Sequence, residues 1–168
     1  TDGSSFYQDD VGTVSGRTDT FKIVIRETQG AGGAAVQQEW STGAAIASQW
    51  QHLFFSFVGN DASGLQFWLD GIEDALSPVA TTNVDNFGNS TDVLQFGLRG
   101  DSGADRNGNL AECAFGDVVL TDPEIIALSK GYSPSLIKPS SLLFYAPLIG
   151  NYSPEIDIVG GYAGTLGG

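Results

Sequence analysis

The sequence has little cysteine, histidine or positive charge, and each scarcity excludes a class of protein. Its 168 residues include one cysteine, one histidine, no methionine and seven lysines and arginines. A single cysteine cannot form a disulfide within the chain, so packing alone must hold the fold. One histidine and one cysteine are also too few soft ligands for a structural zinc site.

The single cysteine and the single histidine are both predicted to be structural. Cys113 lies among the apolar residues of segment 110–115, which favours a small buried hydrophobe over a free reactive thiol. His52 has no cysteine or serine relay that the sequence can assign to it, so we expect a satisfied structural imidazole, one that packs or forms hydrogen bonds. A fold without disulfides fits cytoplasmic assembly or a bacterial or viral exterior protein.

The shortage of bases leaves a strongly acidic chain. Twenty acids against seven bases give a net charge of −13 and a pI near 4.1. The bases are scattered between Arg17 and Lys138, whereas nucleic-acid binding requires clustered cations that displace counterions from phosphates. We therefore expect no nucleic-acid partner, and we expect anionic membrane surfaces to be disfavoured. The acidity suits divalent cations.

The sequence also lacks long apolar runs, and its first residues do not have the pattern of a secretion signal. No stretch approaches the roughly 20 apolar residues that a membrane-spanning helix requires, so no membrane insertion is expected. We expect the chain to begin after initiator removal, after processing, or partway along a longer product. Its length is that of one domain, predicted to span residues 1–168.

Apolar residues recur at every second position in several segments, which is the period of a β-strand. Residues 20–26 carry Phe21, Ile23 and Ile25 at alternate positions, which is typical of a strand. The same reasoning predicts strands at residues 50–58, 65–70, 93–98, 110–115, 118–120 and 142–146. Twenty-three glycines supply the conformations that tight turns require. Many short strands with glycine-rich turns predict an all-β fold, a two-layer antiparallel β-sandwich.

One short α-helix is predicted near residues 122–130. Thr121 and Glu124 have the spacing of a capping box, and Pro123 falls in the first turn. Gly131 is expected to end the helix. This length suits a plug or a connector rather than a layer of the fold.

The chain after this helix is predicted to cross the molecule and close the sheets. Residues 132–141 contain Pro134 and Pro139, which favour an extended segment. Residues 132–168 are therefore expected to hold a crossing segment followed by the closing strands.

Seven short segments stand out in sequence order: WQHLFFSF (50–57), LQFWLDG (65–71), LQFG (94–97), NLAE (109–112), LTDPEI (120–125), GYSP (131–134) and LFYAPL (143–148). In this order they resemble the laminin-G or concanavalin A-like jelly roll in its bacterial and phage-type versions. The family has strands of the types W-x-H-hydrophobic, L-Y-V-D-G and G-x-I-A-E, followed by a closing helix L-s-x-x-E-I. The resemblance covers residues 35–168 and implies a jelly-roll fold in a single domain.

The chain departs from this family at its beginning. Members open with one or more strands before anything that resembles residues 20–26. The opening strand is therefore lost, or another chain supplies it, or the first twenty residues replace it. An unpaired sheet edge would invite association.

A related resemblance concerns catalysis. Residues 154–160 read PEIDIVG, and glycoside hydrolases of the laminarinase type share the jelly roll and carry E-I-D-I-x-E on one strand. Glu155 and Asp157 match that motif, but Val159 and Gly160 stand where the next acid is needed. A retaining glycosidase requires two carboxyl groups about 5 Å apart. We therefore expect no enzyme, with a glycoside hydrolase as a remote alternative.

Calcium is the cofactor that the composition favours most. Asp101, Asp105, Asn107 and Asn109 bring short oxygen side chains together with glycines, and hard cations prefer such ligands. The loop has no closing glutamate of the EF-hand type. An ordinary acidic surface turn is the alternative interpretation.

Sugar binding would require flat aromatic rings presented near loops, because the ring face contacts sugar C–H groups. Trp68, Trp40 and Tyr152 are the predicted ligand-binding residues, with Tyr7 as a further candidate. Trp50 is instead predicted to fill the core at the start of its strand.

The resemblance of residues 110–168 to the phage-type versions of this family implies a function. It suggests a non-catalytic viral structural protein on the virion exterior, such as a capsid decoration, fibre or tail-associated protein. Its expected partners are copies of itself or other virion proteins, with carbohydrate binding to cell-surface glycans as an added role. The alternative is a lectin-like carbohydrate-binding module of a bacterial surface protein, located extracellularly.

Overall fold

The structure, a computed structural model, describes most of the chain in separate stretches. The described residues are 3–9, 20–28, 35–41, 49–58, 64–75, 77–81, 109–148, 155–161 and 163–164. Side chains are described for 49–58, 64–75, 109–148 and 155–161. These residues are mostly strands in antiparallel sheets with few helices, which confirms the all-β prediction at this level.

The chain divides into two compact units, Thr1–Asn107 and Gly108–Gly168. Each unit is described by itself. The expectation of a single domain spanning residues 1–168 stays a prediction. Among the described residues, no helix combines the length and the apolar character needed to cross a membrane.

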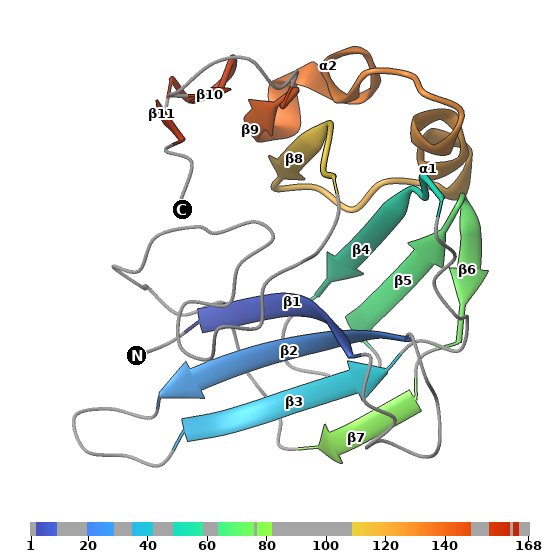
Figure 1. Cartoon of the computed structure of the whole chain (residues 1–168), viewed down its shortest axis with the longest axis vertical. Coiled ribbons are helices and arrows are strands. Elements are labelled where there is room, and N and C mark those ends of the chain that lie inside the picture. Colours follow the sequence, from blue (N-terminus) through green and yellow to red (C-terminus); the bar gives the residue numbers. More distant parts are fainter. Residues whose placement is uncertain are drawn as a thin grey trace. The chain divides into compact units, whose positions relative to one another are not determined.

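The first unit contains a sheet in the order β1-β2-β3-β7 (Figure 1). Its strands are β1 (Gly3–Asp9), β2 (Thr20–Thr28), β3 (Ala35–Ser41) and β7 (Ser77–Thr81), and each neighbouring pair is antiparallel. β2 confirms the predicted strand, since its alternating aromatic and β-branched residues suit a pleated ladder. β1 provides β2 with a neighbour from within the first twenty residues.

The last strand in this order, β7, carries a proline opposite a tryptophan. Pro78 pairs with Trp40, and the register of β3 and β7 shifts between Glu39 and Trp40. Proline lacks the N–H that a ladder uses, so it is tolerated where a strand has a neighbour on one side or at an irregularity. Both conditions hold for β7 among the described strands.

A second sheet of the first unit has the order β4-β5-β6. It is formed by β4 (Leu53–Phe57), β5 (Leu65–Leu69) and β6 (Ile72–Asp74) in antiparallel register. In β5, Leu65 and Phe67 are buried while Gln66 is exposed, as the period of two predicts. Phe67 is fully buried and is the centre of this part of the core.

A two-residue turn joins β5 to β6. Asp70 and Gly71 both have positive φ, 54° and 81°. A two-residue loop with φ positive at both positions is the type I′ turn, whose twist matches that of antiparallel strands. The predicted strand 65–70 therefore ends one residue early, because Asp70 belongs to the turn.

The second unit contains two short ladders (Figure 1). β8 (Cys113–Gly116) pairs with β9 (Leu142–Ala146), and β10 (Glu155–Ile156) pairs with β11 (Ala163–Gly164), both in antiparallel register. β9 is the strand that the sequence predicted at 142–146.

The predicted helix is confirmed as α1 (Asp122–Ser129). Ile125 is the fully buried residue of this helix. Gly131 follows with φ of 87°, the left-handed conformation that glycine adopts readily at a helix end.

The extended segment predicted at residues 132–141 is wrong. The structure instead has a second helix, α2 (Pro134–Ile137), and a 3-10 turn, η2 (Pro139–Ser141). Each begins with a proline. The fixed φ of proline suits the first helical position as well as an extended chain, so its presence did not decide between them.

Two further strand predictions need correction. Glu112 has φ of 56°, which interrupts any extended chain, so the strand expected at 110–115 begins at Cys113. Residues 118–120 are irregular, and Val118 and Val119 are exposed. The strand predicted at 93–98 lies outside the described residues.

Candidate functional site

The predicted sugar platform Trp68 lies inside the β4-β5 ladder. Its side chain is 3% exposed, and its ring centroid is 5.3 Å from that of Phe54 at an interplanar angle of 59°. Phe54 is also its directly opposed partner in the ladder. Trp68 therefore cannot offer a ring face to a sugar without rearrangement of this sheet.

The other two predicted ligand-binding aromatics are less fully described. Trp40 lies in β3, where its backbone pairs with Ile23 on one side and Pro78 on the other. Tyr152 lies outside the described residues, and the side chain of Tyr7 lies outside them too. Their role in binding stays a prediction.

Trp50 is the aromatic residue that the structure exposes. Its side chain is 68% exposed, so the prediction that it fills the core is wrong. The reason is that β4 begins only at Leu53, which leaves Trp50 ahead of the ladder. Residues 50–58 were predicted to be one strand, although the polar residues Gln51 and His52 separate Trp50 from the apolar residues of β4.

His52, just before β4, and Asp70, just after β5, are joined by two hydrogen bonds. The main-chain N–H of His52 donates to Oδ1 of Asp70 at 2.8 Å, and the N–H of Asp70 donates to the carbonyl of His52 at 2.8 Å. Burial lowers the pKa of the His52 imidazole, and the nearby Asp70 charge partly offsets this. The imidazole is therefore neutral at physiological pH.

The prediction of a satisfied structural imidazole is only partly met. Nδ1 of His52 is buried and has no hydrogen-bond partner among the residues that the structure describes. Oγ of Ser56, in β4, is likewise buried and has no hydrogen-bond partner among the described residues. The histidine is thus held through its main chain and its packing.

The predicted calcium ligands are mostly outside the described stretches. Asp101, Asp105 and Asn107 lie there, while Asn109 is described and exposed. Within the described ranges, no three histidine, cysteine or acidic side chains gather as a metal site would require. Calcium binding at residues 101–109 stays a prediction.

Glu155 and Asp157, the residues that match a glycosidase motif, are both buried. Oδ1 of Asp157 accepts the N–H groups of Tyr145 at 2.9 Å and Val159 at 3.0 Å. A carboxylate that receives two main-chain donors fixes the course of the chain. In this structure Asp157 holds a turn of the chain against β9.

Tyr145 joins three segments that are distant in sequence. Its hydroxyl donates to Oε2 of Glu112 and accepts from Oγ of Ser133 at 3.2 Å. Ser133 is also hydrogen-bonded to Ser135 at 2.8 Å. Burial, followed by the Glu112 contact, raises the pKa of the Tyr145 hydroxyl, so it stays protonated at neutral pH.

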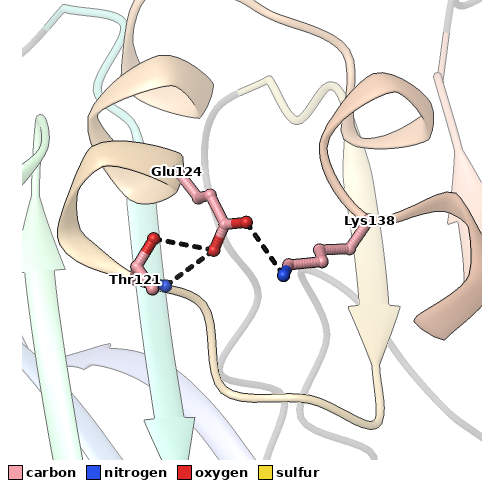
Figure 2. Close-up of polar contacts among 3 residues, drawn as sticks. All are labelled: Thr121, Glu124 and Lys138. Atoms are coloured by element: carbon pink, nitrogen blue, oxygen red, sulfur yellow. Dashed lines mark hydrogen bonds and ion pairs between the residues drawn. The ribbon is translucent and has the colours of Figure 1, made fainter.

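Figure 2 shows how Glu124 connects α1 to the segment between α2 and η2. Its Oε2 accepts the N–H and the hydroxyl of Thr121, each at 2.8 Å, and its Oε1 lies 3.1 Å from Nζ of Lys138. These contacts, with the main-chain bond first, lower the pKa of Glu124. The carboxylate contacts of the predicted capping box are present, and the ion pair to Lys138 is an addition that spacing alone did not indicate.

The environment of Cys113 agrees with its predicted structural role. Burial, with a smaller effect of the Glu112 charge, raises the pKa of the thiol to about 11. A thiol with this pKa is almost wholly protonated at neutral pH and is a poor nucleophile. It is a free cysteine within the second unit.

Several apolar side chains of the second unit are exposed in two short segments. These exposed apolar segments are residues 110–119, with Leu110, Phe115, Val118 and Val119, and residues 156–159, with Ile156, Ile158 and Val159. Isolated exposed apolar residues are normal, whereas a contiguous exposed apolar patch is typical of a contact surface.

Comparison of the chain with known protein families, with curated proteins and with solved structures found no match.

Proposed function

We propose that the chain is a non-catalytic jelly-roll module of the laminin-G or concanavalin A-like type. The antiparallel sheets and the confirmed strands and helix support this proposal. The ordered motifs along residues 35–168 support it as well. In the proposed fold, the sheets stack as the two layers of a sandwich.

The module is proposed to work on a particle exterior as a phage virion structural protein, in contact with copies of itself or other virion proteins. The observation that carries this proposal is the presence of the two exposed apolar segments in the second unit. The chain is strongly charged, with a net charge of −13. Leaving several apolar side chains in contact with water costs free energy, and a protein partner that covers them would remove this cost. A bacterial cell-surface location is the alternative.

The polar contacts of the second unit support a structural role for its carboxylates. Asp157 binds two main-chain N–H groups, and Glu112 binds the Tyr145 hydroxyl. Release of reducing sugar from β-glucans that disappears in Glu155→Gln would overturn the non-catalytic proposal.

The assembly proposal is tested by light scattering after size-exclusion chromatography at physiological salt. We expect the chain to form a defined oligomer, and we expect Val118→Asp combined with Val119→Asp to weaken it. The matched control is Ile72→Asp, which adds a charge at an exposed apolar residue of the first unit. A chain that is monomeric at every concentration, and that binds no particle protein, would contradict the proposal.

Glycan adhesion is the second candidate function, and the exposure of Trp50 favours it. An exposed indole face suits the C–H surface of a sugar ring. On a glycan array, we expect saturable binding that Trp50→Ala abolishes and that Ile72→Ala leaves unchanged. Binding that persists in Trp50→Ala would place the sugar elsewhere, at Trp40 or Tyr152, which the corresponding alanine variants would show.

Calcium is proposed to bind the loop at residues 101–109. Because a ligand that binds only the folded state stabilises it, millimolar calcium should raise the melting temperature. Asp105→Ala should remove that rise, whereas Asp117→Ala, an exposed acid outside the loop, should retain it. An unchanged melting temperature in the wild type would refute calcium binding.

A further inference from the structure

The two exposed apolar segments of the second unit, residues 110–119 and 156–159, differ in the charge at their surface. Residues 110–119 include the exposed acids Glu112 and Asp117 and contain no base. A second copy of the same segment placed against them would bring like charges together, which costs free energy at an interface. Two copies are therefore not expected to meet through this segment on both sides of the contact.

The segment 156–159 has its acid buried. Burial alternates along it, since Asp157 is 2% exposed, whereas Ile156 and Ile158 are 60% and 57% exposed. Alternate residues of an extended chain point to opposite sides, so the two isoleucines lie on the same side. Oδ1 of Asp157 accepts the main-chain N–H of Tyr145 at 2.9 Å on the inner side. The exposed side chains of this segment are therefore apolar and uncharged.

The two segments lie along opposite edges of β9. β8, which is part of residues 110–119, pairs with one edge, with Ala114 opposite Tyr145. The N–H of Tyr145 is bonded to Asp157, and its carbonyl accepts the N–H of Ile158. In an antiparallel ladder, the main-chain groups of one residue point to a single edge, and those of its neighbours point to the other. The segment 156–159 therefore runs beside the edge of β9 that faces away from β8.

We propose, on the basis of the self-association inferred above, that copies of the chain join head to tail, with residues 156–159 of one copy against residues 110–119 of the next. The uncharged segment covers the apolar side chains of the acidic one without bringing a further exposed acid to Glu112 and Asp117. Contacts between two different surfaces of one chain close into a ring where the rotation between copies allows it. The defined oligomer expected above is then a ring.

Two variants, each altered at one segment, test the head-to-tail contact by light scattering after size-exclusion chromatography. One combines Ile156→Asp and Ile158→Asp, and the other combines Val118→Asp and Val119→Asp. Each variant alone should self-associate about tenfold more weakly or worse, because the contact would bury an unpaired acid. An equal mixture should form dimers and nothing larger, since each variant keeps the surface that the other has lost. Ile72→Asp, the matched control in the first unit, should assemble as the wild type does.

The outcomes separate the head-to-tail contact from the proposed function. A wild-type chain that stays monomeric contradicts both. A wild-type oligomer that persists in the variant of residues 156 and 158, or a mixture of variants that stays monomeric, refutes the head-to-tail contact and leaves self-association standing. Loss of binding to another particle protein in that variant, with self-association intact, would show that residues 156–159 face a different partner and would refute the contact as well.

Single cysteines keep the test decisive if an aspartate variant does not fold. Chains with Ile158→Cys are mixed with chains carrying Val118→Cys and oxidised mildly, so that thiols held close together form a disulfide. The native Cys113 should take little part, because burial raises the pKa of its thiol to about 11. The mixed disulfide should form faster than either disulfide between like chains. Like chains that join as fast as unlike ones would contradict the head-to-tail contact.

Discussion

At the scale of single residues, Tyr145 has several connections that sequence reasoning missed. Its main chain binds Asp157 and Ile158, and its hydroxyl binds Glu112 and Ser133. Glu112 is 33 positions away in sequence. No periodicity or motif spacing encodes a contact over such a separation, so the connection became visible only in the fold.

Replacing Tyr145 with phenylalanine removes the hydroxyl and keeps the packing. We expect the variant to lose about 1–2 kcal/mol in its free energy of unfolding, because a hydrogen bond to a charged acceptor is lost. Urea denaturation measures this loss. Tyr132→Phe, at an exposed tyrosine, is the control and should be neutral. Equal stability of Tyr145→Phe and the wild type would show that the hydroxyl contacts are unimportant in solution.

Glu124 should make stability depend on pH in the acid range. Its pKa is lowered in the folded chain, mainly by the Thr121 hydrogen bonds and then by Lys138. A group with a depressed folded-state pKa contributes stability that is complete above its unfolded pKa and is lost as pH falls through the folded value. Glu124→Gln should therefore lower stability at neutral pH and flatten this acid dependence.

Lys138→Ala is the matched comparison for Glu124, since it removes the ion pair and leaves both Thr121 contacts. Its effect on the pH dependence should be the smaller of the two, because Lys138 contributes less than Thr121 to the lowered pKa. The unfolding free energies of both variants, measured between neutral and acid pH, show which one changes the pH dependence more. The reverse order of effects would contradict the assignment of causes.

The tryptophans show what sequence could not determine at this scale. Trp50 was expected to be buried but is exposed, whereas Trp68 was expected to be available to a ligand but is buried. In residues 50–58 apolar residues occupy both faces, and in residues 65–70 Trp68 lies on the same face as the polar Gln66 and Asp70, so the period of two predicts each strand without determining the burial of its tryptophan. Only the start of the ladder at Leu53 decides the exposure of Trp50.

At the scale of secondary-structure elements, the β5-β6 hairpin depends on its turn. Gly71 has φ of 81°, so Gly71→Ala should cost about 1–2 kcal/mol, the penalty of a left-handed conformation for a residue with a Cβ. Gly71→Asn should cost less, because asparagine tolerates this conformation. Urea denaturation of both variants measures the difference, and equal stability of Gly71→Ala and the wild type would exclude a type I′ turn.

Elements with strong local signals were predictable from sequence, and those with ambiguous signals were not. The alternation in residues 20–26 and the cap and glycine around α1 each specify one conformation, and both predictions are confirmed. Prolines at 134 and 139 are compatible with two conformations, and the sequence-based choice was wrong. The positive φ of Glu112 has no sequence signature, since glutamate rarely adopts it.

At the scale of the whole molecule, charge and exposed apolar side chains act against each other. A net charge of −13 keeps copies apart, although at physiological ionic strength charges are screened beyond about 8 Å. The exposed apolar segments favour association once surfaces are that close. We therefore expect assembly to be weakened by low salt, where repulsion extends further.

The proposed role of the chain as part of a particle can be tested by the state in which the native protein occurs. Material from the native source is separated on a density gradient, and an antibody against the chain locates it in the fractions. We expect the chain to sediment with large particles and to stay with them through a high-salt wash. A chain found at the position of a free small protein, with none in the particle fractions, would contradict it.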